Sequence, residues 1–254
     1  MPVSTAGGAI TDANGNVVAN YPEVTVYDLR DPSNVPTFFV LRNRPDYHQT
    51  YNGLELTATK RLSHRWLMRG NVAYTDWKEH SGSGSYADPT PKIAAGACQG
   101  ACNGVFVTQS ATSGAFQDVF INSKWSFNLT GLYQLPFDFN LGASLTGRQG
   151  YPNIVRDDVS LPSGATSQVI LHNPVGSSRF DSVYELDLRA AKDFRFFNRL
   201  EVTISADLFN APNQRTILQR TTLASTDEVA NGNFNRITEL QSPRVWRLGA
   251  RLTF

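Results

Sequence analysis

The chain has 254 residues, a formal net charge of +1 and 41% hydrophobic residues. This near-neutral balance argues against nucleic-acid binding and against membrane attachment through a polybasic segment. Mean hydropathy is −0.30, and no run approaches the roughly 18 apolar residues that a membrane-spanning helix needs. A transmembrane β-barrel is compatible with these values, because its strands are apolar only at every second position.

Residues 1–46 are poorly patterned, and we expect one or two strands and a loop there. Asp12 begins a spacing that resembles a calcium-binding loop, but Val17 stands where such a loop needs glycine and the flanks look extended. The Asn14-Gly15 pair favours positive φ angles instead. It therefore predicts a turn between two strands.

Residues 47–254 show alternating apolar and polar positions, which predicts antiparallel strands with one apolar and one polar face. Six segments form three hairpins with tight turns: 51–62 with 66–75, 125–135 with 137–148, and 184–194 with 200–208. A seventh segment, 245–254, ends the chain. Long loops rich in small and polar residues separate the hairpins.

The last segment places Trp246, Leu248, Ala250, Leu252 and Phe254 on one face and ends in the phenylalanine itself. A soluble protein gains little from ending a strand on an exposed aromatic ring. The ending resembles the closing strand of bacterial outer-membrane β-barrels. That resemblance implies a terminal signal for the barrel-assembly machinery, formed by Trp246, Leu248, Leu252 and Phe254.

Strand and loop lengths favour a membrane barrel over a soluble sandwich or lipocalin-like barrel, which also show alternation. The predicted strands have about 11 to 13 residues, enough to cross a bilayer at a tilt, whereas globular strands usually have about 5 or 6. Tight turns alternate with loops of about 30 to 45 residues, as short periplasmic turns and long outer loops do in such barrels.

Aromatic residues mark both ends of the apolar faces. At the tight-turn end lie Trp66, Phe137, Phe194 and Phe254, and at the loop end lie Tyr74, Trp125, Tyr184 and Trp246. Such rings settle at the two interfaces of a bilayer. We therefore predict an all-β, antiparallel transmembrane barrel segment with its tight turns and carboxyl terminus on the periplasmic side.

Charged residues of both signs, from Glu55 to Arg251, fall on the polar faces and would line the lumen of a barrel. They are interpreted as solvated charges that compensate one another, or as a wall that contacts a plug or a substrate pathway. Lys60 and Lys192 are exceptions on the apolar face near the tight-turn end. We expect their ammonium groups to extend to the interface.

Catalytic chemistry is not indicated anywhere in the sequence. Cys98 and Cys102 lie four residues apart in a predicted loop, where an oxidising compartment would favour a local disulfide. The four histidines are too scattered to suggest a metal site, and there is no phosphate loop, nucleophile elbow or pair of catalytic carboxylates. The sequence predicts no enzyme and no cofactor.

Several segments resemble the barrel of Oar-like TonB-dependent receptors, a family with a carboxypeptidase-regulatory-like amino-terminal domain. They are Tyr51–Leu56, Lys60–Ser63, Asn122–Trp125, Ala206–Asn210 and Ser242–Phe254. The resemblance covers about residues 45–254 and implies an outer-membrane transporter with a barrel of about 22 strands, filled by a plug. A TonB box would couple uptake to the proton-motive force of the inner membrane.

The chain departs from that family because no signal peptide, TonB box or plug is found in it. We expect it to hold about seven to nine of the strands and to be the carboxyl-terminal part of such a receptor, unable to transport alone. The expected location is the outer membrane of a Gram-negative-type bacterium. The expected partners are outer-membrane lipid, the barrel-assembly machinery, an unknown extracellular ligand and, only through the missing plug, TonB.

Two other hypotheses remain at this stage. The first is a small autonomous outer-membrane barrel of eight strands with a structural or adhesive role, since eight strands can close. The second is a soluble β-sandwich binding module such as a lectin. The exposed apolar faces argue against the second hypothesis.

Overall fold

The computed structural model describes residues 2–11, 14–27, 48–80, 103–106, 122–159, 168–171, 178–196, 200–224 and 232–254, together with Gly176 and Val229. The regular elements in these ranges are β-strands, and every strand pairing is antiparallel. This confirms the predicted all-β, antiparallel fold. Among the described residues, no helix is long and apolar enough to cross a membrane.

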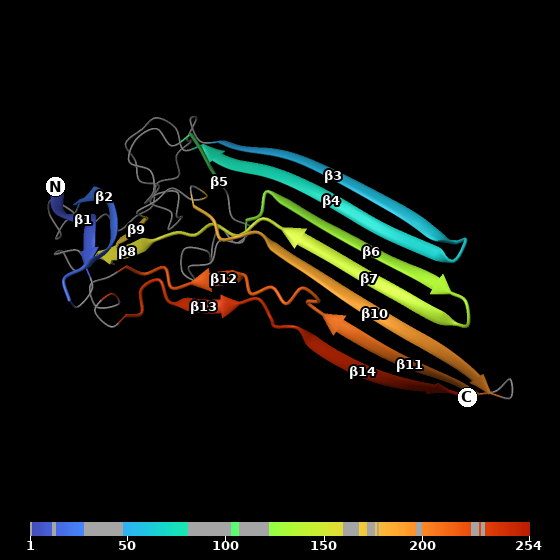
Figure 1. The fold of residues 1–254 in the computed structure, drawn as a ribbon. Coiled ribbons are helices and arrows are strands. Elements are labelled where there is room, and N and C mark those ends of the chain that lie inside the picture. Colours follow the sequence, from blue (N-terminus) through green and yellow to red (C-terminus); the bar gives the residue numbers. More distant parts are fainter. Residues whose placement is uncertain are drawn as a thin grey trace.

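Seven long strands lie side by side in one open sheet, in the order β14-β11-β10-β7-β6-β4-β3 (Figure 1). Their bounds are β3 His48–Ser63, β4 Trp66–His80, β6 Trp125–Leu135, β7 Phe139–Arg148, β10 Val183–Phe196, β11 Leu200–Phe209 and β14 Val245–Thr253. A short strand, β5 (Asn103–Phe106), pairs with the far end of β4. Within the described residues, β3 and β14 are the sheet edges and do not pair with each other.

Two tight turns lie at the same end of the sheet and distinguish that end from the opposite one. His64 and Arg65 have φ angles of 51° and 68°, and Phe137 and Asp138 have φ angles of 66° and 58°. Two consecutive positive φ angles are the mark of a type I′ turn, whose twist matches that of the flanking strands. We call this side of the sheet the turn end, and the carboxyl terminus lies there as well (Figure 1). The opposite side is the loop end.

The remaining strands lie beyond the loop end (Figure 1). They form three two-stranded sheets: β1 (Pro2–Thr11) with β2 (Val17–Tyr27), β8 (Arg156–Val159) with β9 (Gln168–Leu171), and β12 (Ile217–Arg220) with β13 (Ile237–Leu240). Gly15 has a φ angle of 81° between β1 and β2, so the predicted turn there is confirmed. The interpretation of the long connections as plain loops missed β8, β9, β12 and β13, because four residues are too few to show an alternation.

The first hairpin is taller than the rest of the sheet. Tyr74 on β4 pairs with Trp125, the first residue of β6, yet β4 continues to His80. This extension is paired with β3 on one side and with β5 at its tip, where Lys78 opposes Phe106. The ring of Trp77 meets that of Tyr51 edge to face at 6.4 Å between centroids. The extension is therefore an ordered wall at the loop end.

The sheet has no apolar core of its own. Among the described residues, the buried hydrophobic side chains are Ile154, Ala191, Ala224 and Val229. The apolar strand positions are exposed instead, up to 80% at Leu248. The register aligns them across strands, as in Leu145, which opposes both Leu129 and Leu186. The result is one continuous apolar surface, the apolar face, that nothing in the described chain covers.

Asn210 joins the end of β11 to the segment that follows it and to the segment before β14. Its side chain is 1% exposed, and its amide nitrogen donates to the carbonyl oxygens of Gln214 (2.9 Å) and Ser242 (2.7 Å). Its side-chain oxygen accepts from the backbone N–H of Gln214, and its own N–H donates to a carboxylate oxygen of Asp187. A φ angle of 46° also places Asn210 in the left-handed region, which asparagine tolerates better than most residues.

We predict that Asn210→Ala lowers the free energy of unfolding by about 1–3 kcal/mol, because it removes a buried side chain that makes three hydrogen bonds with the backbone. The measurement is a urea titration of the refolded full chain. Asn235→Ala is the matched control, since Asn235 also has a positive φ angle (59°) but is exposed. Equal losses in the two variants would show that backbone conformation alone, and not the buried amide, determines the effect.

Candidate functional site

The face opposite the apolar one, the polar face, is organised around the buried carboxylate of Asp207 on β11. Asp207 is 5% exposed, and Arg189 of β10 donates to one of its oxygens at 3.2 Å. Arg247 of β14 donates to the other oxygen through Nε at 3.0 Å, and its Nη2 lies at 3.0 Å from the same atom. One carboxylate therefore joins three neighbouring strands, and both guanidinium groups remain accessible from the polar side.

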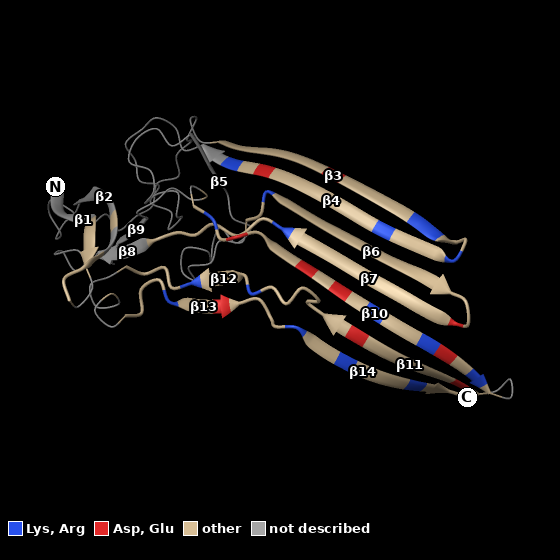
Figure 2. Cartoon of the chain, in the orientation of Figure 1, with Lys and Arg blue, Asp and Glu red and all other residues tan. Residues whose placement is uncertain are grey.

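A second polar cluster lies nearer the turn end. One carboxylate oxygen of Asp193 accepts from the hydroxyl of Thr203 at 2.7 Å, and the other accepts from the amide of Asn140 at 3.2 Å. Arg195 lies 3.7 Å from Asp138 and 3.9 Å from Glu201, in pairs that are about half exposed and therefore weak. Charges of both signs thus follow β10 and β11 (Figure 2). These pairs support the interpretation of mutually compensating charge on this face.

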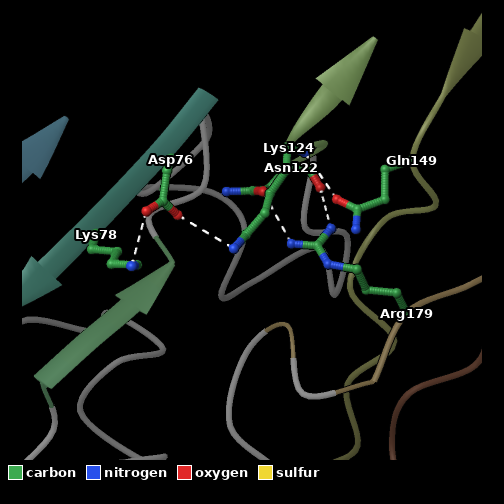
Figure 3. A network of polar contacts seen from close by, with 6 residues as sticks. All are labelled: Asp76, Lys78, Asn122, Lys124, Gln149 and Arg179. Atoms are coloured by element: carbon green, nitrogen blue, oxygen red, sulfur yellow. Dashed lines mark hydrogen bonds and ion pairs between the residues drawn. The ribbon is translucent and has the colours of Figure 1, made fainter. Parts of the chain in front are cut away.

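A polar network at the loop end ties together the segments that enter and leave β6, β7 and β10 (Figure 3). Asp76 of β4 forms ion pairs with Lys78 at 2.9 Å and with Lys124 at 3.3 Å. The backbone N–H of Lys124 donates to the side chain of Gln149 at 3.0 Å. We call this set of contacts among Asp76, Lys78, Lys124 and Gln149 the rim network. It joins β4 to the residue directly before β6 and to the residue directly after β7.

Arg179 extends the rim network to the segment before β10. Its Nη1 donates to the carbonyl oxygens of Asn122 (2.6 Å) and Gly150 (3.0 Å), and its Nη2 donates to the side chain of Asn122 (3.2 Å). Burial lowers the pKa of Arg179 from its ordinary value, and the group remains a cation at neutral pH. Sequence reasoning missed Arg179, because a single arginine in a loop carries no periodic signal.

Aromatic rings gather at the loop end of the apolar face, as predicted. Trp125 and Phe127 are stacked at 6.2 Å, and Tyr184 of β10 lies 6.0 Å from Trp125. These rings meet across β7 because Gly147, which is buried between Phe127 and Tyr184, has no side chain. A Cβ atom at Gly147 would collide with the ring of Phe127.

Exposed aromatic residues occupy the turn end, as was also predicted. Phe137 in the turn is 84% exposed and the terminal Phe254 is 97% exposed. Trp66 and Phe194 lie at the same end and are partly exposed. The apolar face is therefore bounded by aromatic residues at both ends.

An open hollow of about 930 Å³ lies in the middle of the apolar face. Small residues from four strands make room for it: Gly131, Ala143, Ala190 and Ala206. Larger side chains, among them Trp66, Leu141 and Trp246, surround them. The lining is almost wholly apolar, so the hollow fits hydrocarbon rather than a polar substrate.

The remaining predicted site residues have the following places. Trp246, Leu248 and Leu252 project from the exposed face of the edge strand β14, and Phe254 follows directly after it. Their recognition by the assembly machinery stays a prediction. Cys98 and Cys102 lie outside the described residues, so the predicted disulfide stays a prediction as well. Among the described residues, no three metal-ligating side chains come together.

Comparison with known proteins gives a distant likeness to a solved structure. No protein-family model matches the chain, and no curated protein matches its sequence. Among solved structures, the chain is similar to the outer membrane transporter YddB from Escherichia coli, with 13% identity and a TM-score of 0.44 over 82% of this chain. The match covers 26% of the transporter, so this chain spans about a quarter of its length. A likeness at this level carries no conclusion about activity.

We predict that Asp207→Asn lowers the free energy of unfolding by about 1–2 kcal/mol, because the amide cannot hold both guanidinium groups. Glu201→Gln on the same strand is the control and should cost less than about 0.5 kcal/mol, since its ion pair with Arg195 is long and half exposed. Urea titration of the refolded chain measures both. Equal values would contradict a special role for Asp207 in joining the strands.

For the rim network, we predict that Arg179→Lys speeds amide hydrogen exchange at Asn153 and Phe180. These two N–H groups donate to Ser178 and Tyr151 across the contact that Arg179 holds in place. A lysine cannot make the same forked contact. Arg220→Lys is the control, because Arg220 donates to the carbonyl oxygen of Asn235 in a different sheet. Unchanged exchange in Arg179→Lys would mean that the loops are held without this contact.

Proposed function

We propose that this chain contributes a wall of strands to a transmembrane β-barrel of a bacterial outer membrane, and that the complete protein takes part in substrate uptake. The observation that carries the proposal is the continuous apolar face of seven long antiparallel strands, bounded by aromatic residues at both ends. Water is a poor solvent for such a surface. A bilayer is the environment that matches both its hydrocarbon band and its aromatic borders.

Strand length supports this environment. The central strands β6 and β7 have 11 and 10 residues, and a transmembrane strand tilted by about 45° needs about 9–11. Trp125 opens β6 at the loop end, and Phe139 opens β7 at the turn end. Each strand therefore spans from one aromatic border to the other.

The polar face supports a barrel interior. Its carboxylates and guanidinium groups form contacts with one another on a surface that water can reach, as around Asp207. This arrangement suits the lining of a water-filled or plug-filled lumen. Among the described residues, these ion pairs join neighbouring strands, and we propose a transport-related role rather than an enzymatic one.

The open edges indicate that further strands complete the barrel. Unpaired backbone groups at a sheet edge are costly in hydrocarbon, where no water can satisfy them. Among the described residues, the main sheet holds seven long strands, and its eighth strand, β5, has only four residues, all beyond the loop end of β6. The strands β1 and β2 form a separate sheet. The alternative of an autonomous eight-stranded barrel is therefore less favoured than a larger barrel to which this chain contributes.

The finer proposal is a TonB-dependent receptor of the Oar-like kind. It is supported by the segments that resemble that family, of which Ala206–Asn210 contains both Asp207 and Asn210. In this proposal, the outer loops contact an extracellular ligand, and a plug domain of the complete receptor would provide the contact with TonB. The chain would not transport by itself.

We predict that Leu129→Arg weakens insertion of the full chain into lipid vesicles by about 2–4 kcal/mol, because Leu129 lies midway along the apolar face. Thr130→Arg is the matched control one residue away on the polar face, and it should insert normally. Insertion is measured by co-flotation with zwitterionic vesicles. Equal insertion of the two variants would overturn the membrane proposal.

A further inference from the structure

Two lysines interrupt the apolar face near the turn end, and their side chains do different things. The ammonium group of Lys60 donates to the carbonyl oxygens of Ser63 and Trp66, each at 3.0 Å, and to the hydroxyl of Ser63 at 2.8 Å. It also lies 3.8 Å above the ring of Trp66. Lys60 is therefore committed to closing its own hairpin turn.

Lys192 on β10 makes no comparable hydrogen bonds within the described residues. Its ammonium group lies 4.2 Å from the ring centroid of Phe139 and 5.2 Å from that of Phe194. Within the described residues, the ammonium group of Lys192 contacts these two rings and makes no hydrogen bond or ion pair. Rings attract a cation but use none of its N–H bonds directionally, so the donors of Lys192 remain available to an anion.

No carboxylate of the described chain competes for this position. The nearest acidic residues on the same strands point to the polar face, where Asp193 bonds to Thr203 and Asn140 and where Glu201 lies near Arg195. Asp138, in the turn before Phe139, lies near Arg195 as well. In the described part of the turn end, the apolar face thus carries positive charge and aromatic rings, and no ion pair joins Lys192 to an acidic side chain. This composition complements a phosphate group at a bilayer interface.

The apolar hollow begins at the next position of the same strand. Ala190, two residues before Lys192 on the same face, lines the hollow together with its register partners Leu141 and Ala206. The register partners of Lys192 are Phe139 and Ile204, which continue the same rows toward the turn end. A cation at the mouth of an apolar hollow matches a molecule with an anionic head and a hydrocarbon tail.

We propose that Lys192, whose ammonium group lies against the rings of Phe139 and Phe194, binds the phosphate headgroup of one anionic phospholipid, whose acyl chain lies in the hollow lined by Gly131, Ala143, Ala190 and Ala206. This inference rests on the proposed membrane function and deepens it, because it assigns a preferred lipid to one place on the apolar face. Lys60 takes no part, since its donors are already used at the turn.

The test is native mass spectrometry of the full chain in detergent micelles, titrated with phosphatidylglycerol or with phosphatidylcholine. We expect the wild type to bind one phosphatidylglycerol about fivefold more tightly than phosphatidylcholine, as one interfacial lysine near an anionic headgroup would provide. Lys192→Gln should remove this preference, and Lys192→Arg should keep it. Lys78→Gln is the control, because Lys78 pairs with Asp76 at the opposite end of the sheet.

A second variant tests the tail. Ala190→Phe fills the hollow, so it should weaken the binding of both lipids while the ratio between them stays near fivefold. Inorganic phosphate at the same concentration should not displace the bound lipid. Displacement by phosphate would show a simple anion site and overturn the lipid assignment.

Different outcomes would contradict the lipid site and the membrane function. If the wild-type chain co-floats with vesicles but binds the two lipids equally, the lipid site is wrong and the membrane function stands. The same conclusion follows if Lys192→Gln keeps the preference. If Leu129→Arg and Thr130→Arg co-float equally, the proposed membrane function is wrong and the lipid site falls with it.

Discussion

The structure depends on backbone hydrogen bonding between neighbouring strands, because a single layer has no core to hold it together. Each long strand exposes its apolar side chains on one face, as Leu248 and Ile204 do, and gains no burial from a second layer. The stability of the sheet must then come from the backbone hydrogen bonds between strands, from polar contacts on the polar face and from the apolar medium that covers the apolar face. The proposed bilayer would supply that medium and strengthen the ladder by excluding water.

Contacts on the polar face fix the register in which neighbouring strands pair. A slip of one residue between strands would move every apolar side chain to the wrong side. Asp207 and Asp193 each bond to side chains on two neighbouring strands, so they hold one register among β7, β10, β11 and β14. Asn210 then fixes where β11 stops and which connections pass beside it. The charged residues of the polar face therefore help to determine how the strands pair, as the apolar residues do.

The long strands could be predicted from sequence because alternation is a direct consequence of pleated geometry. The segment 125–135 coincides with β6, and the other six differ by a few residues at their ends. The short strands β12 and β13 could not be predicted, because four residues show no period and their pairing depends on distant partners. The role of Arg179 was hidden for the same reason, since it joins Asn122 and Gly150 only after the fold brings them together.

The tall first hairpin makes the loop end of the sheet uneven. The six residues of β4 that follow Tyr74 rise by about 20 Å at about 3.3 Å per residue, while β6 and β7 stop near the aromatic border. In the proposed setting, β3 and β4 would extend the mouth of the barrel on one side with long strands of the main sheet, and the separate β12–β13 hairpin would extend it beside β11 and β14 (Figure 1). A molecule arriving from outside would then meet ordered strands before it reaches the charged polar face.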